Sequence, residues 1–241
     1  MDDTTVSAAP QARAVDAGRG LAWWTEAWPL FTKYAGMWIV LGLAMLVIFI
    51  VLAFIPFLGG IASALLGPVF VGGWLLAARK AEAGSAPEIG DLFQGFKDKF
   101  VPLIVLGAVL LGLVIVVTLV VGMLGFGAVM GMGSAADSAA GAAAAMSAGF
   151  VSLLVLLLFA LLIGLMFWYA PALVVFRNVP PVDALKASFS AGLKNIVPFL
   201  LYGVIYIVAS VIASIPFGLG WIVLMPVLML TMYVSYKDLF V

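Results

Sequence analysis

The stretch that decides the fold runs from Pro180 to Val241 and reads PPVDALKASFSAGLKNIVPFLLYGVIYIVASVIASIPFGLGWIVLMPVLMLTMYVSYKDLFV. It begins with a polar-faced helix, Asp183 to Asn195, and continues with an apolar segment, Ile196 to Ser214. After the turn Ile215-Pro216-Phe217-Gly218, a second apolar segment ends at Tyr236-Lys237. Because about 20 apolar residues cross a bilayer as a helix, this stretch predicts an interfacial helix followed by a membrane hairpin.

The composition of the whole chain agrees with a membrane protein. Of 241 residues, 66% are apolar and 9% charged, with a mean hydropathy of +1.30. A soluble domain carries about 25% charged residues, so this chain cannot cover a water-facing surface. We predict an all-α polytopic membrane helix bundle with six transmembrane helices. The six charge-free apolar runs are Gly36–Phe57, Leu58–Ala78, Val101–Gly127, Phe150–Phe176, Ile196–Ser214 and Phe217–Ser235.

The pattern of the last stretch recurs twice earlier in the chain. Val101-Pro102 matches Val197-Pro198 at an offset of about 96 residues, and Ile55-Pro56-Phe57 matches Ile215-Pro216-Phe217. We therefore predict three repeats, each an interfacial helix plus a helical hairpin. Their bounds are about 21–80, 87–177 and 180–241, within a transmembrane domain of 21–241 that follows a disordered cytoplasmic tail of 1–20.

Two further interfacial helices complete the prediction. The first places Leu21, Trp24, Trp28 and Phe31 on one face, which we expect to lie on the membrane with its indole rings among the headgroups. The second covers Glu88–Phe100.

The middle repeat departs from the other two. Its hairpin turn is replaced by residues 127–149, a segment rich in Gly, Ala and Ser with Asp137 as its one charge. The glycines disfavour a single stable helix, so we predict a loosely ordered loop with a short helix. The alternative is a lid or docking loop.

Basic residues indicate which way the chain faces. Lys and Arg accumulate in cytoplasmic loops, and here all eleven fall on the side of the tail, the linkers and the interfacial helices. We predict a multi-pass protein of the bacterial cytoplasmic (inner) membrane with both termini in the cytoplasm.

Little in the sequence points to chemistry. The chain has no Cys and no His, which removes thiol chemistry and the usual zinc sites. No charged residue lies within a predicted span, and no nucleotide-binding or nucleophile motif occurs. We expect no enzyme activity, no catalytic residue, no cofactor, no metal and no nucleic-acid partner.

Some residues within the spans could line a cavity. Each repeat has one proline in its second span, and span five carries a polar stripe of residues four apart. Prolines in membrane helices are commonly structural, which is the preferred interpretation, and hinges around a shared cavity are the alternative. The stripe indicates either interhelical hydrogen bonds or a hydrated groove. The cavity or packing candidates are Pro68, Pro171, Pro226, Tyr202, Tyr206 and Ser210. Met225, Met229 and Met232 share one face of the last span, where thioethers usually fill gaps in a core.

Basic residues near the span ends are candidates for contact with lipid headgroups. They either set the orientation alone or also bind anionic lipid, which contributes about 1 kcal/mol per residue near the surface. The candidates are Arg79, Lys80, Lys97, Lys99, Arg177 and Lys194.

Two segments carry a resemblance to known families. The run Asp183-Ala184-Leu185-Lys186-Ala187-Ser188-Phe189, followed by Gly192, Lys194 and Val197-Pro198-Phe199, resembles the repeated unit of uncharacterised bacterial membrane proteins. That group is loosely similar to the membrane region of glycerophosphodiester phosphodiesterases. The segment from Trp28 through Trp38 to Ile55-Pro56-Phe57-Leu58-Gly59-Gly60 is similar to a proteobacterial inner-membrane family with six predicted spans. The resemblance implies location and fold. It implies no catalysis, because the phosphodiesterase barrel is not in this sequence.

Two functions follow as hypotheses. The first is a non-enzymatic inner-membrane protein that organises membrane lipids or another membrane protein. The second is a small-solute or lipid transporter with a cavity lined by the proline-containing helices.

Overall fold

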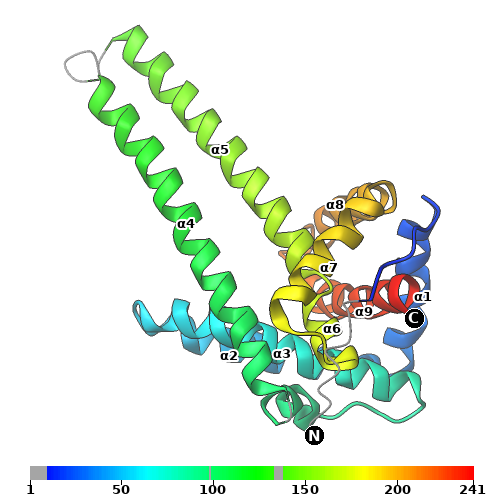
Figure 1. Cartoon of the computed structure of the whole chain (residues 1–241). Coiled ribbons are helices and arrows are strands. Elements are labelled where there is room, and N and C mark those ends of the chain that lie inside the picture. Colours follow the sequence, from blue (N-terminus) through cyan, green and yellow to red (C-terminus); the bar gives the residue numbers. More distant parts are fainter. Residues whose placement is uncertain (1–9, 98, 133–137) are drawn as a thin grey trace, which may run out of the picture. The chain divides into compact units, whose positions relative to one another are not determined.

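The computed structural model describes residues 10–97, 99–132 and 138–241, and every regular element in these residues is helical (Figure 1). The elements are α1 (Arg19–Lys33), α2 (Ala35–Ala53), α3 (Leu58–Glu82), the 3-10 helix η1 (Ile89–Phe96), α4 (Phe100–Met132), α5 (Ala139–Phe167), α6 (Ala170–Arg177), α7 (Pro181–Lys194), α8 (Ile196–Ser214) and α9 (Trp221–Phe240).

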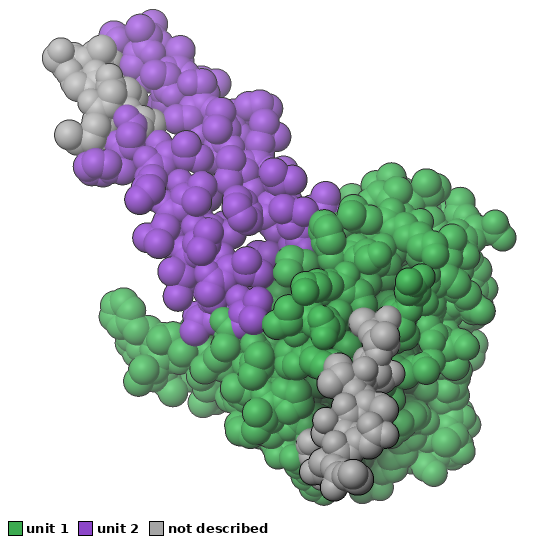
Figure 2. All heavy atoms as spheres, in the orientation of Figure 1, with its two compact units in different colours: residues 1–108, 165–241 green, residues 109–164 purple. Residues whose placement is uncertain are grey.

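Six segments in the described residues are long and apolar enough to cross a membrane, which confirms the predicted fold class. They are Ala35–Ala53, Leu58–Glu82, Phe100–Gly127, Ala139–Arg177, Ile196–Ser214 and Trp221–Phe240. The chain forms two compact units, residues 1–108 with 165–241, and residues 109–164 (Figure 2).

The second unit differs from the loop predicted at 127–149. Helix α4 continues to Met132 and α5 begins at Ala139, while residues 133–137 lie outside the described residues. Ser138 caps α5, because its Oγ accepts a hydrogen bond from the backbone N–H of Gly141 at 3.1 Å. The alanines, the strongest helix formers, outweigh the glycines along this segment.

In the first unit, the second helix of a hairpin (α3 or α9) is more buried than the first (α2 or α8). About half of the apolar stretch of α3 (50%) and of α9 (56%) is buried, against 17% in α2 and in α8. Phe176 of α6 packs on Tyr233 and Tyr236 of α9, and the guanidinium of Arg79 in α3 lies over the Phe176 ring. The ends of α3, α6 and α9 therefore form the core of this unit.

The short helices η1, α7 and α1 each pack on a longer helix. A Cβ atom on Gly73 of α3 would lie 2.2 Å from the carbonyl oxygen of Leu92, so η1 lies directly on α3. Ser188 of α7 donates a hydrogen bond to the carbonyl oxygen of Leu165 in α5 at 2.7 Å. A Cβ on Gly20 of α1 would lie 2.2 Å from the carbonyl oxygen of Pro198 in α8. Helix α1, the first in the chain, thus packs on the α8–α9 hairpin.

The two short hairpin turns share one backbone feature. Phe57 and Phe217, the last residues of the two Ile-Pro-Phe sequences, both have positive φ angles, 60° and 52°. Such angles are uncommon outside glycine, so their recurrence at the two phenylalanines is a shared feature of the two turns. Both phenylalanine side chains are almost fully exposed. Turns with apolar tips suit the boundary of a bilayer.

The amino-terminal segment differs from the tail predicted for residues 1–20. Residues 1–9 lie outside the described residues, but residues 10–18 are held by the rest of the chain. The backbone N–H of Arg13 donates to the carbonyl oxygen of Leu239 at 3.0 Å, and that of Val15 donates to Oδ1 of Asn195 at 2.9 Å. Partners about 180 or more residues away supply these bonds, which is why local composition did not predict them.

Candidate functional site

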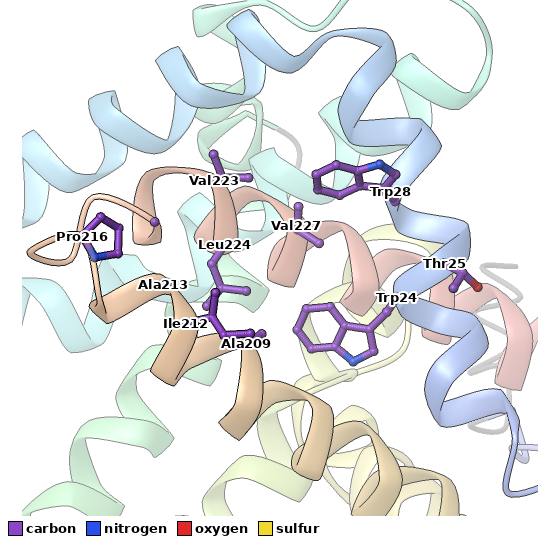
Figure 3. Close-up of a pocket in the computed structure, with 11 residues that line it drawn as sticks. Trp24, Thr25, Trp28, Ala209, Ile212, Ala213, Pro216, Val223, Leu224 and Val227 are labelled. Carbon is purple, nitrogen blue, oxygen red and sulfur yellow. The ribbon is translucent and has the colours of Figure 1, made fainter.

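An apolar groove lies between α1 and the α8–α9 hairpin, and we call it the α1 groove (Figure 3). Its volume is about 680 Å³. Trp24 and Trp28 of α1 lie at one end and Pro216 of the turn lies at the other. Ala209 and Val223 are among the residues between them. The groove therefore runs from α1 along the α8–α9 hairpin.

The polar atoms of the α1 groove gather at the α1 end. Trp24 stacks on Tyr202 with ring centroids 5.0 Å apart, and its buried indole N–H has no hydrogen-bond partner among the described residues. Thr25 donates its hydroxyl proton to the carbonyl oxygen of Ala22 at 3.0 Å. No charged residue lines the described groove. Its polarity therefore falls from the α1 end toward the turn.

Helix α1 has a buried face that the sequence analysis did not assign, and this face includes Phe31, which was expected to lie on the membrane. Trp23, Ala27 and Phe31 are buried, whereas Leu21 and Trp28 are each 51% exposed. The sequence could not separate these faces, because apolar residues cover both the side toward the protein and the side toward lipid.

A second apolar space, the α2–α9 crevice, lies between α2, α3 and α9. Its volume is about 570 Å³, and it extends from Gly218 in the turn to Trp74 of α3. At the Trp74 end, a Cβ on Gly42 of α2 would lie 3.4 Å from Cγ of Pro226 and 3.9 Å from the Trp74 ring. The three helices meet there and close the crevice at that end.

Helix α9 separates the two spaces. Val223 and Val227 line the α1 groove, while Met225, Pro226 and Met229 line the α2–α9 crevice. One helix of the inner core therefore forms a wall of both.

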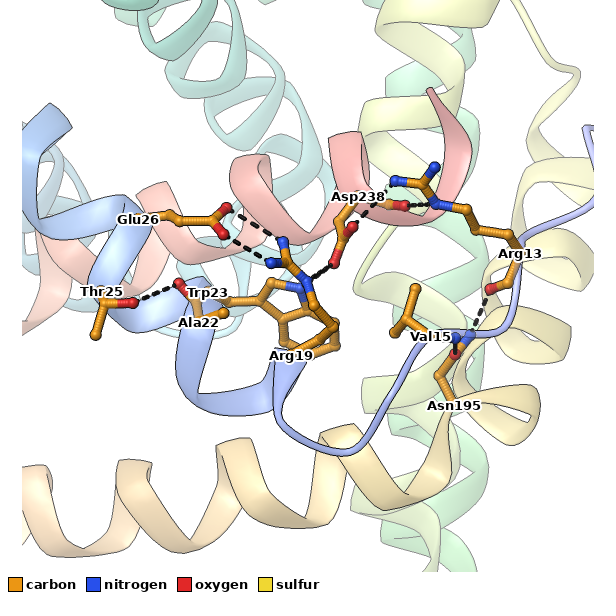
Figure 4. Close-up of polar contacts among 9 residues, drawn as sticks. All are labelled: Arg13, Val15, Arg19, Ala22, Trp23, Thr25, Glu26, Asn195 and Asp238. Atoms are coloured by element: carbon orange, nitrogen blue, oxygen red, sulfur yellow. Dashed lines mark hydrogen bonds and ion pairs between the residues drawn. The ribbon is translucent and has the colours of Figure 1, made fainter.

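A polar network beside the α1 groove joins the amino-terminal segment to α9 (Figure 4). Asp238 accepts hydrogen bonds from Nε of Arg19 at 2.6 Å, Nε1 of Trp23 at 2.9 Å and Nη2 of Arg13 at 3.0 Å. Arg19 also pairs with Glu26 at 2.8 Å. Burial opposes the charge of Arg19, but the two carboxylates outweigh burial and raise its pKa. This network fixes α1 against the end of α9.

A second network joins α3 to its neighbours. Glu82 accepts a hydrogen bond from the hydroxyl of Tyr233 at 2.7 Å and pairs with Lys237, both in α9. Lys80 pairs with Glu88 at 2.9 Å and with Asp91 at 3.2 Å, which holds η1 on α3. The charges at this end of the first unit mostly serve to join helices.

Five of the six candidate headgroup contacts have partners within the protein. Arg79 lies over the ring of Phe176, and Lys80 pairs with two acids. Lys99 donates a hydrogen bond to Oδ1 of Asn178. Arg177 and Lys194 donate to backbone carbonyl oxygens, those of Phe240 and Ala12 respectively. For Lys97, which is exposed, the described residues provide no such contact. Binding of lipid by these six residues stays a prediction.

The cavity and packing candidates occupy different surroundings. Pro226 lines the α2–α9 crevice, and Pro68 and Pro171 are buried in α3 and in the first turn of α6. The hydroxyls of Tyr202 in α8 and Thr231 in α9 are 2.9 Å apart and buried. Tyr202 therefore makes a hydrogen bond between two helices. The last two candidates, Tyr206 and Ser210, also lie in α8. Tyr206 packs edge-on against Trp221, and the buried hydroxyl of Ser210 has no hydrogen-bond partner among the described residues.

Several residues that line the two spaces were not indicated as site residues by the sequence. Gly42, Met45 and Trp74 lie on two different helices, and only their packing brings them together. No group of three or more His, Cys, Asp or Glu side chains that could hold a metal occurs in the described residues.

Comparisons with known proteins place this fold in a family. A family model described as a domain of unknown function, DUF7847, matches residues 58–237. The chain belongs to the DUF7847 family. The DUF7847 match starts at the first residue of α3 and ends within α9, so it includes the inner core. The DUF7847 chain is also similar to a probable inner membrane protein of Burkholderia thailandensis, with 26% identity over 213 residues, 86% of this chain and 78% of the relative. No solved structure matches.

The family and the six spans together describe a multi-pass inner-membrane protein. The comparisons assign no activity to this chain, because the family description names none.

Proposed function

We propose that this protein is a non-enzymatic component of the inner membrane that binds and organises bilayer lipid. The α1 groove is the observation that carries the proposal. A lipid has a polar end at the interface and an apolar chain in the hydrocarbon, and the groove has Trp24 and Trp28 on an interfacial helix and apolar walls down to Pro216. Its volume lies within the range of about 300–1,000 Å³ that is usual for ligand pockets.

The orientation is part of this proposal. Both termini lie in the cytoplasm, because the eleven Lys and Arg residues all belong to the tail, the linkers, the short helices and the adjoining span ends. The α1 groove then receives a lipid of the cytoplasmic leaflet. The resemblance to the membrane region of glycerophosphodiester phosphodiesterases belongs to the proposal as well, as a likeness of membrane repeats without catalytic residues.

The test is to extract the protein with its surrounding lipid in polymer nanodiscs and to compare the retained lipids with bulk membrane after mild detergent exchange. We expect lipid to stay bound to the wild type. Ala209→Phe, which fills the groove, should release it. The matched control is Val208→Phe, because Val208 is the adjacent residue and is 54% exposed.

Equal lipid retention by both variants would contradict the proposal. A protein partner that co-purifies in stoichiometric amounts while no lipid is retained would favour a scaffold for another membrane protein instead.

The position of α9 favours a second candidate function, lipid transport. Residues of α9 line both the α1 groove and the α2–α9 crevice, and Pro226, which cannot donate a backbone hydrogen bond, lies in this helix. Reconstituted protein should then speed the passage of fluorescent lipid between leaflets, measured by dithionite bleaching. No acceleration over protein-free vesicles would exclude this candidate.

A further inference from the structure

We propose that the α2–α9 crevice holds one acyl chain of a lipid whose headgroup lies at the level of the hairpin turns, and that it binds the lipid through the hydrocarbon chain and not through the headgroup. This inference rests on the membrane location in the proposed function, but it concerns a different space and the opposite leaflet.

The place of the crevice in the fold determines what surrounds it. Its walls are the middle and turn-side parts of α2 and α9, which both belong to predicted spans. It begins at Gly218 in the turn and ends at Trp74, where Gly42 and Pro226 close it. A chain entering at the turn therefore lies along the membrane normal, with its methyl end against the Trp74 ring.

The lining determines which molecule fills the crevice. Apolar cavities of this kind exclude water, because water finds too few polar partners there. An unfilled space of about 570 Å³ would leave its apolar walls without van der Waals contacts. The hydrocarbon of the bilayer is the medium next to both walls. An acyl chain supplies these contacts without leaving a polar group unpaired.

The charge of the headgroup does not enter recognition at this site. No charged residue lines the described crevice. The polar group at its turn end is the indole of Trp221, which already donates a hydrogen bond to Oγ of Ser214 at 3.2 Å. Binding should therefore depend little on salt or on lipid charge.

The side chains of the crevice also allow chains of different shape. Met45, Met225 and Met229 contribute to its walls. Unbranched thioether side chains adopt many conformations and fit irregular partners. A straight or a kinked chain can therefore be accommodated.

The test uses a phosphatidylcholine with a photoreactive diazirine near the end of one acyl chain, added to the full-length protein in nanodiscs. After illumination, the labelled peptides are mapped by mass spectrometry. We expect adducts on the residues of the closed end, Trp74 and Met229, at higher yield than on Val47, which is 56% exposed on α2. An anionic phosphatidylglycerol probe with the same chain should give the same pattern.

Two variants make the test specific. Gly42→Leu places a side chain inside the closed end, where the Cβ itself meets Pro226 at ordinary contact distance, and should remove the adducts on Trp74 and Met229. Gly203→Leu is the matched control, since Gly203 is the counterpart of Gly42 in the third repeat and nothing lies within 4 Å of its Cβ position. It should leave the adducts unchanged.

Even labelling of all lipid-facing residues, persistence of the adducts in Gly42→Leu, or cross-links to another protein in place of lipid adducts would overturn the inference. Lipid retention in the α1 groove is measured on the same preparations. If lipid is retained in the α1 groove while the crevice stays unlabelled, only this inference is rejected. If no lipid is retained in the groove and the crevice is also unlabelled, the proposed function is rejected as well.

Discussion

Asp238 in the last turn of α9 and Arg19 at the start of α1 form an ion pair with an Nε–Oδ2 distance of 2.6 Å, 219 residues apart in the sequence. The side chain of Asp238 is only 10% exposed. This pair holds the start of α1 against the end of α9. It also sets the position of Trp24 and Trp28, which lie on the same helix as Arg19 and line the α1 groove.

Replacing this carboxylate should loosen α1. In Asp238→Asn, Arg19 and Trp23 lose their charged acceptor, and hydrogen bonds to charged groups contribute about 1.5–3 kcal/mol each. We expect a lower unfolding temperature in detergent, measured by fluorescence-detected size exclusion after heating. Asp183→Asn is the control, because its contact with Lys186 is long, 3.9 Å, and exposed. Equal unfolding temperatures for the two variants would show that the pair contributes nothing.

The contact between α3 and η1 requires a glycine. Gly73→Ala would place a methyl group 2.2 Å from the carbonyl oxygen of Leu92, so η1 must move. We expect a loss of about 1–3 kcal/mol, as for other overpacked sites, and a lower yield of monodisperse protein. Gly60→Ala on the same helix is the control, since its Cβ position is free of neighbours within 4 Å. Normal yield and unchanged thermal stability of Gly73→Ala would contradict this packing.

The orientation can be tested by cysteine labelling, because the chain has no native cysteine. With both termini in the cytoplasm, a cysteine in place of Phe57 or Phe217 should react with an impermeant maleimide in intact cells. A cysteine in place of Lys97 should react only after the membrane is permeabilised. The reverse pattern would invert the proposed topology.

Lys97 and Lys80 should have separable roles. Lys97→Ala removes an exposed charge and should reduce the excess of anionic lipid around the protein, by about 1 kcal/mol of contact free energy, without changing stability. Lys80→Ala breaks the pairs with Glu88 and Asp91 and should lower the unfolding temperature. The two measurements are lipid analysis of nanodiscs and thermal unfolding. A drop in anionic lipid for Lys80→Ala alone would reverse the assignment.

Hydropathy and short-range pattern were enough to predict the six spans, the order of the elements and the two Ile-Pro-Phe turns. These features depend on residues that are neighbours in the chain, and a lipid solvent demands a long apolar helix wherever the chain crosses it. The positive φ angles of Phe57 and Phe217 agree with the matching of the two turns that was made from their residues alone.

Tertiary structure alone decided which apolar faces meet each other. In a membrane, a helix face toward lipid and a helix face toward protein are both apolar, so the sequence could not tell that Trp23 is buried while Trp28 lines an open groove. The same reason hid the α2–α9 crevice, whose walls come from three helices. The bonds that hold residues 10–18 join groups that are remote in the sequence, and only folding brings such partners within reach.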